Sequence, residues 1–384
     1  EAFGTVAGGD AVSFKWEVST DGTNFSLVAG APNSAFYTIP ENYINDFVSA
    51  EKSKELWFRC ERTNPVGTTV TAALPMLFIR TNTSGYGEEN GVKYLEIETK
   101  NRHYPGGTVK IALTNLGATN DNNLGDFYQW GRVGDGHQVI GWAKSTGTRD
   151  NIFDAATDAN RYPGGTTQIT GDGSANREPV GLTLTSSGQV TTGTNGYGKF
   201  ILAGDATRSD WSNYATLNNR WGNGSTNGTN NRITDIAHSS WTFGAQPPAG
   251  NNPCPGGWSV PSCWQWEDMH DGNGSSTTFE NGWHPATRIN HWDFRIARHG
   301  AVGGAVITNA AGEKVFLPAA GYRYNGDGSL YSVGSNGHYW SSTPSGGFSV
   351  YSGAYTLMFA IGYVYSGNST NSRAYGHNIR CVTE

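Results

Sequence analysis

Hydrophobic and polar residues alternate with a period of two along much of the chain, which is the pattern of half-buried β-strands. Near the N-terminus, Trp16 and Val18 alternate with polar neighbours, and Asp21-Gly22 then marks a tight turn before the next strand. Glycine tolerates the positive φ that such a hairpin turn requires. The same alternation returns in a second segment, ELWFRCERTNPVGTTV. We therefore predict short antiparallel strands, typical of a β-sandwich, in the N-terminal part.

Helical periodicity is rare and is strongest in one segment, VPSCWQWEDMHD. Ser262 is a suitable N-cap, because its hydroxyl can accept a hydrogen bond from a free backbone N–H of the first turn. Trp266 and Met269 follow at the spacing of one helix face. A second and weaker helical pattern is HWDFRIARHG, residues 291–300, which ends in a glycine.

The composition excludes several classes of protein. The chain has 384 residues, of which 36% are hydrophobic, 12% aromatic and 15% charged. Disordered chains are rich in charge and poor in aromatic residues, so this is a folded protein of two or three domains. The net charge of −6 and the absence of a Lys/Arg cluster argue against a nucleic-acid partner. No run is long and apolar enough for a membrane helix, so any membrane attachment needs an anchor that the sequence lacks. The first residues also lack a signal peptide.

Four cysteines are spread along the chain, at positions 60, 254, 263 and 381. They are too few for a disulfide scaffold and are wrongly spaced for a zinc site. These features favour an exported protein with one bridge at most.

A polar segment at 83–91 is predicted to be a linker between an N-terminal domain, 1–82, and a larger domain, 92–384. Within the larger domain, residues 143–250 are rich in Thr, Asn and Gly. By composition this insert is either disordered or a set of long ordered loops. Aromatic residues at intervals favour ordered loops held by buried anchors, because disordered segments are poor in them. The anchors are Phe200, Trp211, Trp221 and Trp241.

The N-terminal segment resembles bacterial immunoglobulin-like domains, which share a W-x-V-S-x-D-G hairpin followed by Y/F-x-C-x-x-T-N-x-x-G. The matching residues are Trp16, Val18, Ser19, Asp21, Gly22, Phe58, Cys60, Thr63, Asn64 and Gly67. The opening strands are short here, and the cysteine that would pair across the sandwich is missing. Cys60 is therefore expected to be a buried free thiol. The resemblance implies an Ig-like β-sandwich that acts as a spacer.

The larger domain resembles the Fibrobacter succinogenes major paralogous domain of bacterial surface proteins. NPCPGGWSVPSCWQWEDM corresponds to the D-P-C-P-x-G-W-R-V-P-T-x-x-E-W signature of that family, and YQWGR at 128–132 corresponds to its upstream block. Further matches are FLPAAGYR, YWSSTP, AYTLMF and SRAYGHNIRCV. Asn252, Ser259 and Cys263 depart from the family pattern. Together the blocks cover about 92–384 apart from the insert.

This resemblance implies a C-type-lectin-like fold, shared with formylglycine-generating enzymes and with proteins that retroelements diversify. We therefore expect a mostly β protein, with an α+β second domain that has few helices and long loops. In such a fold the last strand runs near the first helix, which implies a disulfide between Cys254 and Cys381. Two alternatives stay open: both cysteines reduced and buried, or a Cys254–Cys263 bridge.

The sequence offers no catalytic constellation above background. H-E-x-x-H, G-x-S-x-G and phosphate-binding glycine loops do not occur, and we expect no enzyme activity. The spacing of the histidines between 270 and 299 fits no metal template. Lectins of the implied fold often bind calcium, so a structural calcium stays open, but no cofactor is expected. Its candidate ligands are Asp121, Asn123 and Asp126, or Asp271, Asn273 and Glu280.

Residues 321–376 interleave apolar anchors with Tyr, Ser, Gly and Asn, which is the composition of antibody-like binding surfaces. Tyrosine supplies a large rigid contact area, while the small polar residues adapt their hydrogen bonds. The alternative is that β-rich loops favour these residues in any case. The candidate ligand-binding residues are Tyr324, Asn325, Tyr331, Asn336, His338, Phe348, Tyr351, Tyr363, Tyr365, Asn368 and Asn371.

We therefore expect an extracellular, cell-surface adhesin or receptor-binding module that binds a protein or glycan through its C-terminal loops. The resemblance further suggests that a retroelement diversifies these loops. The alternative is a structural subunit of a surface fibre, pilus or phage tail fibre, whose contacts serve assembly. An unrecognised enzyme is the third hypothesis, and a deep pocket lined by carboxylates or by Cys and His would support it.

Overall fold

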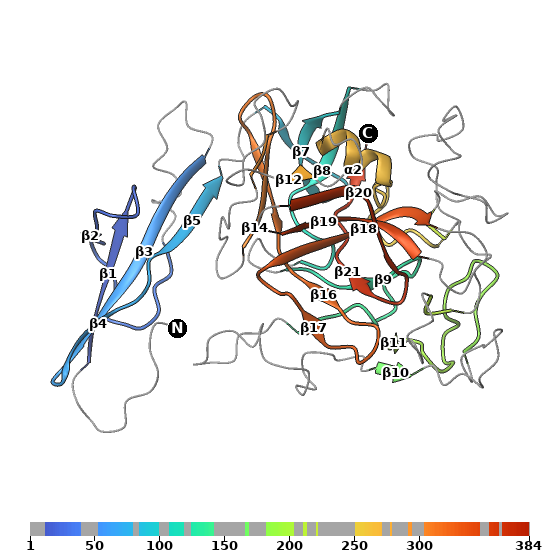
Figure 1. The fold of residues 1–384 in the computed structure, drawn as a ribbon, viewed down its shortest axis with the longest axis horizontal. Helices are drawn as coiled ribbons and strands as arrows, with labels where there is room; N and C mark the ends of the chain where they lie inside the picture. Colours follow the sequence, from blue (N-terminus) through green and yellow to red (C-terminus); the bar gives the residue numbers. More distant parts are fainter. Residues whose placement is uncertain are drawn as a thin grey trace.

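The computed structural model of the chain describes fifteen segments. They are residues 12–39, 53–79, 84–99, 107–118, 124–141, 166–168, 182–202, 210–212, 220–221, 250–270, 277–278, 291–293, 303–345, 353–360 and 363–383. These segments are mostly β-strand, with one helix among them (Figure 1). No helix in these segments is long and apolar enough to cross a membrane.

The N-terminal part forms one antiparallel sheet in the order β2-β1-β3-β4, with β5 also paired to β3. The hairpin predicted at Asp21-Gly22 is present, and Gly22 has φ +73°. Cys60 is buried and free, as expected. The described residues of 1–82 contain this one sheet and not the second sheet of a sandwich. The strands are β1 (Ser13–Ser19), β2 (Ser26–Leu27), β3 (Ser53–Asn64), β4 (Gly67–Val70) and β5 (Leu74–Ile79).

The larger part begins and ends in one antiparallel sheet, in the order β22-β8-β7-β6. Strand β6 lies inside the segment predicted as a linker, so that boundary was wrong. Asn90 and Gly91, both with positive φ, make the tight turn that pairs β6 with β7. Asn-Gly is the preferred pair for such a turn, so the sequence itself carries the signal for this hairpin. The strands are β6 (Tyr86–Glu89), β7 (Val92–Glu98), β8 (Thr108–Ala112) and β22 (Val382–Thr383).

A second sheet, in the order β12-β20-β19-β18, lies at the centre of the larger part (Figure 1). Its strands are β12 (Thr277–Thr278), β18 (Asn336–Ser345), β19 (Gly353–Ala360) and β20 (Tyr363–Ser372). Helix α2 (Cys263–His270) packs against it. Tyr339, Leu357 and Phe359 from the sheet share one buried apolar core with Trp266 and Met269 from the helix. This core fixes which face of the sheet is inside.

The start of α2 is the predicted one. The Ser262 hydroxyl accepts a hydrogen bond from the Gln265 N–H at 3.1 Å, and the Gln265 side chain accepts one from the Ser262 N–H at 2.6 Å. This reciprocal pair is a capping box, which satisfies two backbone donors at the helix end. Trp266 and Met269 are both buried on one face, as their spacing predicted.

The described segments of the larger part also form three smaller sheets, in the orders β13-β14-β15, β17-β16-β21-β9 and β10-β11. The helix predicted in 291–300 is wrong at its start, because His291–Asp293 is a strand paired with β14; residues 294–300 lie outside the described segments. The strands are β9 (Tyr128–Gln129), β10 (Thr166–Gln168), β11 (Phe200–Leu202), β13 (His291–Asp293), β14 (Gly304–Thr308), β15 (Lys314–Pro318), β16 (Tyr322–Arg323), β17 (Leu330–Tyr331) and β21 (Gly376–His377).

Buried aromatic side chains attach the described parts of the 143–250 insert to the core of the larger part. Phe200 and Trp211 are fully buried and Trp221 is 2% exposed, while Trp241 lies outside the described segments. The Trp211 indole donates a hydrogen bond to the Trp130 carbonyl at 2.7 Å. Trp221 packs against Trp130, with ring centroids 5.6 Å apart. These described parts are therefore ordered against the core, as the anchor hypothesis predicted.

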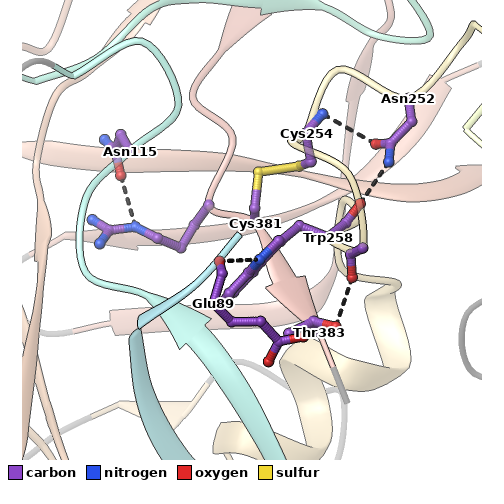
Figure 2. Close-up of a disulfide and its surroundings, with 9 residues drawn as sticks. Glu89, Asn115, Asn252, Cys254, Trp258, Cys381 and Thr383 are labelled. Carbon is purple, nitrogen blue, oxygen red and sulfur yellow. Dashed lines mark hydrogen bonds between the residues drawn. A yellow bond between two sulfur atoms is a disulfide. The ribbon is translucent and has the colours of Figure 1, made fainter. Parts of the chain in front are cut away.

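A disulfide joins Cys254 to Cys381, with their Cα atoms 6.0 Å apart (Figure 2). Of the three alternatives left open by the sequence, this is the pairing implied by the family resemblance; Cys263 is a buried thiol outside the bridge. Two backbone hydrogen bonds between Ser259 and Val382, both 2.9 Å, hold the same two segments together. Figure 2 also shows the Trp258 indole donating to the Glu89 carbonyl. The segment before α2 is thereby tied to the sheet of β6 and β22.

Candidate functional site

The candidate site lies on the face of the β18–β20 sheet that is turned away from α2. Residues paired across an antiparallel sheet point to the same side. The register pairs His338 with Met358 and Met358 with Tyr365. It likewise places Asn336 and Tyr363 on that side, opposite the core residues Tyr339 and Leu357. The amide of Asn336 donates a hydrogen bond to the Tyr363 hydroxyl at 3.2 Å, which agrees with this assignment.

Four tyrosines form a closed ring of contacts next to this face, and we call them the tyrosine quartet. They are Tyr322, Tyr324, Tyr331 and Tyr375. Each side chain contacts two others, with centroid distances of 5.8 Å (322–331), 5.3 Å (324–331), 5.7 Å (324–375) and 5.5 Å (322–375). Tyr324 and Tyr331 are 36% and 42% exposed, and the other two are half-buried.

The quartet is held by a hairpin that runs from Tyr322 to Tyr331. Arg323, on the other side of strand β16, is 1% exposed and donates to the carbonyls of Gly328 and His137. The Asp327 carboxylate accepts hydrogen bonds from the Ser329 N–H and hydroxyl and, at 3.4 Å, from the Tyr331 hydroxyl. These bonds fix the tip of the hairpin and place one exposed carboxylate beside the tyrosines.

Two buried histidines lie beneath the quartet. The His338 ring is 4.9 Å from the Tyr322 ring and 5.1 Å from that of His377, which stacks on Trp340 at 4.1 Å. None of the four imidazole nitrogens has a hydrogen-bond partner among the described residues. Burial lowers the pKa of His338 to about 4 and that of His377 well below its usual value. Both imidazoles are therefore neutral at pH 7.

Burial also raises the pKa of Tyr322 and of Tyr375, and the neighbouring tyrosines add to this effect. Their hydroxyl groups therefore stay protonated through the neutral range and are available both to donate and to accept hydrogen bonds. The quartet is an uncharged, aromatic and amphipathic surface. Such side chains provide contact area with little loss of conformational entropy.

The structure places the predicted ligand-binding residues in three kinds of position: exposed or half-buried at the surface, buried, or outside the described segments. Tyr324 and Tyr331 are exposed, and a further set is half-buried on or beside the same surface: Asn325, Asn336, Tyr363, Tyr365 and Asn371. His338 was predicted to be exposed, and this is wrong: it is 5% exposed, because Tyr322 from another strand covers it. Phe348 and Tyr351 lie outside the described segments, as does the side chain of Asn368.

Tyr322 and Tyr375 belong to the surface but were not among the predicted residues. Tyr322 precedes Tyr324 by two positions, so strand alternation places both on one side, and this signal was available in the sequence. Tyr375 gave no such signal, because it reaches the quartet through the pairing of β21 with β16. The Asn325 amide, which donates to the Ser372 hydroxyl at 3.3 Å, joins the same two segments.

A second group of polar side chains is a buried ion network. Asp210 lies between the guanidinium groups of Arg220 and Arg373, at 3.4 and 3.2 Å. Asp135 accepts hydrogen bonds from Arg132 and from His137. All of these side chains are buried or nearly so. Since each carboxylate is already paired with cationic or imidazole groups, the network ties the insert to the core and is not a candidate ligand site.

The described residues contain no group of three or more His, Cys, Asp or Glu side chains able to hold a metal ion. Of the candidate calcium ligands, only Asp126 is described. Burial raises the pKa of its carboxyl to about 6, and this carboxyl accepts a hydrogen bond from the Ile140 N–H. Asp121, Asn123, Asp271, Asn273 and Glu280 lie outside the described segments.

Comparison with known proteins gives one match. A family model described as a domain of unknown function (DUF8237) matches residues 307–382. This segment contains the β18–β20 sheet, the hairpin and all four residues of the tyrosine quartet. No curated protein matches the chain, and no solved structure matches it.

Proposed function

We propose that the chain is an extracellular adhesin or receptor-binding module without enzymatic activity, which binds a protein or glycan on another cell or matrix. The N-terminal sheet is then part of an Ig-like spacer, and the larger part has a C-type-lectin-like fold that presents the binding surface. The observation that carries the proposal is the tyrosine quartet: four mutually contacting tyrosines, two of them exposed, beside a half-buried Tyr/Asn face. Aromatic clusters of this kind dominate the energetics of protein interfaces.

The geometry supports a rigid scaffold beneath an adaptable surface. Trp340 lies on the same side of β18 as His338 and is fully buried, and its indole donates to the Tyr128 carbonyl at 2.6 Å. The half-buried asparagines, by contrast, hydrogen-bond to other side chains rather than to the core backbone. Substitution of such side chains leaves the core unchanged, which is what diversification by a retroelement requires. Sibling copies of the chain are then expected to differ at the Tyr and Asn positions while retaining Trp340 and Cys381.

The proposal is tested by binding of the full chain to printed arrays of glycans and of extracellular-matrix proteins. Tyr324→Ala and Tyr331→Ala are each expected to weaken capture on the responding spots by tenfold or more, because truncating an aromatic hot spot costs about 2 kcal/mol. Tyr197→Ala is the matched control, since Tyr197 is 38% exposed and is outside the quartet. Unchanged capture by folded quartet variants would show that the surface is misassigned.

The same variants separate binding from assembly. If the chain were a fibre subunit, the wild-type protein would form trimers or polymers in sedimentation experiments, and the quartet variants would change that assembly state. A monomer that loses array binding on substitution favours the adhesin.

A further inference from the structure

The exposed part of the quartet is an aromatic surface of the kind that attracts a cation. The four contacts around the quartet span 5.3 to 5.8 Å between ring centroids. The Tyr322 and Tyr331 rings are stacked at 17° to each other, whereas the Tyr324 and Tyr331 rings meet at 67°, and an aromatic face attracts a cation within about 6 Å of its centroid. Tyr324 and Tyr331, which are on opposite strands of the hairpin, are the exposed sides of the quartet.

In their described part, residues 303–383 place a carboxylate and no exposed Lys or Arg side chain beside the quartet. In the described part of residues 303–383, the Lys and Arg side chains are Lys314, Arg323, Arg373 and Arg380. The three arginines are at most 1% exposed, and half-buried Lys314 is on β15, where its backbone hydrogen-bonds to the Tyr86 hydroxyl. The exposed carboxylate of Asp327, by contrast, is bonded to the Tyr331 hydroxyl at the edge of the quartet. The surface therefore favours a cation and disfavours an anion.

From these two observations we infer that the tyrosine quartet and Asp327 bind a cationic side chain, a lysine or arginine exposed on a partner protein. The inference rests on the proposed function and narrows it, because it selects a protein with exposed basic residues over a neutral glycan. The exposed rings of Tyr324 and Tyr331 attract the cation, Asp327 neutralises its charge at the edge, and the binding is expected to weaken with added salt.

The test uses five-residue peptides, Gly-Ser-Xaa-Ser-Gly with blocked ends, in which Xaa is lysine, arginine, acetyl-lysine or norleucine. They are titrated into the isotope-labelled full chain and followed by NMR chemical shifts. The lysine and arginine peptides are expected to shift resonances of the hairpin, and to bind about five-fold or more tightly than the two neutral peptides.

Substitutions identify which interactions are responsible. Tyr324→Phe keeps an aromatic face and should retain binding of the lysine peptide, while Tyr324→Leu should lose it about five-fold. Asp327→Asn keeps an acceptor for Ser329 but removes the charge, so it should weaken binding and reduce its salt dependence. Tyr197→Leu is the control that should change nothing.

Equal binding of lysine and acetyl-lysine peptides, or no binding of any peptide, would overturn the inference. It would do so without affecting the proposed function if the array experiment still shows capture that depends on Tyr324 and Tyr331. If neither the peptide titration nor the array capture depends on Tyr324 and Tyr331, the quartet is not the binding surface.

Discussion

Asp210 and Arg373, separated by 163 positions in the chain, form a buried ion pair in which the guanidinium lies 3.2 Å from the carboxylate. Burial lowers the pKa of Arg373 to about 10, and Arg220 contributes to this decrease, whereas Asp210 opposes it. The pair joins the insert to the segment that follows β20. Because both groups are desolvated, the loss of either partner leaves an uncompensated charge inside the protein.

Asp210→Asn is therefore expected to lower the free energy of unfolding of the larger part by about 3 to 5 kcal/mol. The control is Glu89→Gln, which removes a partly exposed ion pair with Lys110 and should cost no more than about 1 kcal/mol. Urea unfolding followed by tryptophan fluorescence measures both. Equal costs would mean that the buried network contributes no more than a surface pair.

Removing the disulfide should destabilise the larger part. Cys254 and Cys381 are 127 positions apart, and closing a loop of this size restricts the unfolded chain by about 4 to 5 kcal/mol in the chain-entropy model. Reductant is expected to lower the melting temperature of the wild-type protein to that of a Cys254→Ala, Cys381→Ala variant. That double variant should not respond to reductant, because the remaining cysteines, Cys60 and Cys263, form no disulfide. A response there would point to another bridge.

His338 should make the protein less stable in acid. Its pKa is about 4 in the folded protein against an ordinary value of 6.5, so the unfolded chain binds the proton first as the pH falls. The contribution of His338 to the free energy of unfolding is fully present above about pH 6.5. It is lost as the pH falls toward 4 and amounts to roughly 3 kcal/mol.

His338→Phe removes that contribution, and it also removes the charge through which His338 lowers the pKa of His377. Phenylalanine preserves the ring contact with Tyr322, and no hydrogen bond to the described residues is lost on substitution. The unfolding free energy of the His338→Phe variant should decline less between pH 6.5 and 4 than that of the wild type. His137, with pKa lowered to about 4, and Asp126, with pKa raised to about 6, titrate in both proteins, so their contributions cancel in the difference. Identical pH profiles would contradict the assignment.

Gly321 should be required for the position of Tyr331. It has φ +75°, and a Cβ atom there would lie 2.1 Å from the Tyr331 carbonyl oxygen. Gly321→Ala combines left-handed strain with overpacking and is expected to cost about 3 kcal/mol or more. Gly91→Ala is the matched control, because Gly91 has φ +77° and a Cβ atom there would meet no atom within 4 Å. This variant should therefore lose only the about 1 to 2 kcal/mol that left-handed strain costs. Thermal unfolding compares them, and equal losses would show that the close approach is unimportant.

Local signals in the sequence predicted the local structure well. The Asp21-Gly22 hairpin and the Ser262 helix start follow from turn and capping chemistry that acts within a few residues. The segment HWDFRIARHG shows the limit of such reasoning. Its spacing indicated a helix, but Trp292 and Asp293 pair with Ile307 and Val306 of β14, and this tertiary pairing overrides the local preference.

The site was predictable in composition and not in arrangement. Tyr324 and Tyr331 were identified from the Tyr-, Ser- and Asn-rich segment. The quartet also contains Tyr375, which directly precedes β21 and lies beside the hairpin because β21 pairs with β16. His338 has the alternation of an outward-facing residue, and no nearby residue reveals that Tyr322 will cover it. The backbone bridge between Gly321 and Gly337, which brings their two segments together, depends on the whole fold.

The register of the first sheet has a mechanical consequence. Tyr86 pairs with Leu95, Leu95 pairs on its other side with Ile111, and Ile111 pairs with Val382, so the first and last described strands of the larger part lie in a single row of one sheet. A tensile load applied at residues 84 and 383 would cross that row and the adjacent Cys254–Cys381 bond. It would bypass strands β16 to β20, so the tyrosines would keep their geometry while the molecule is pulled.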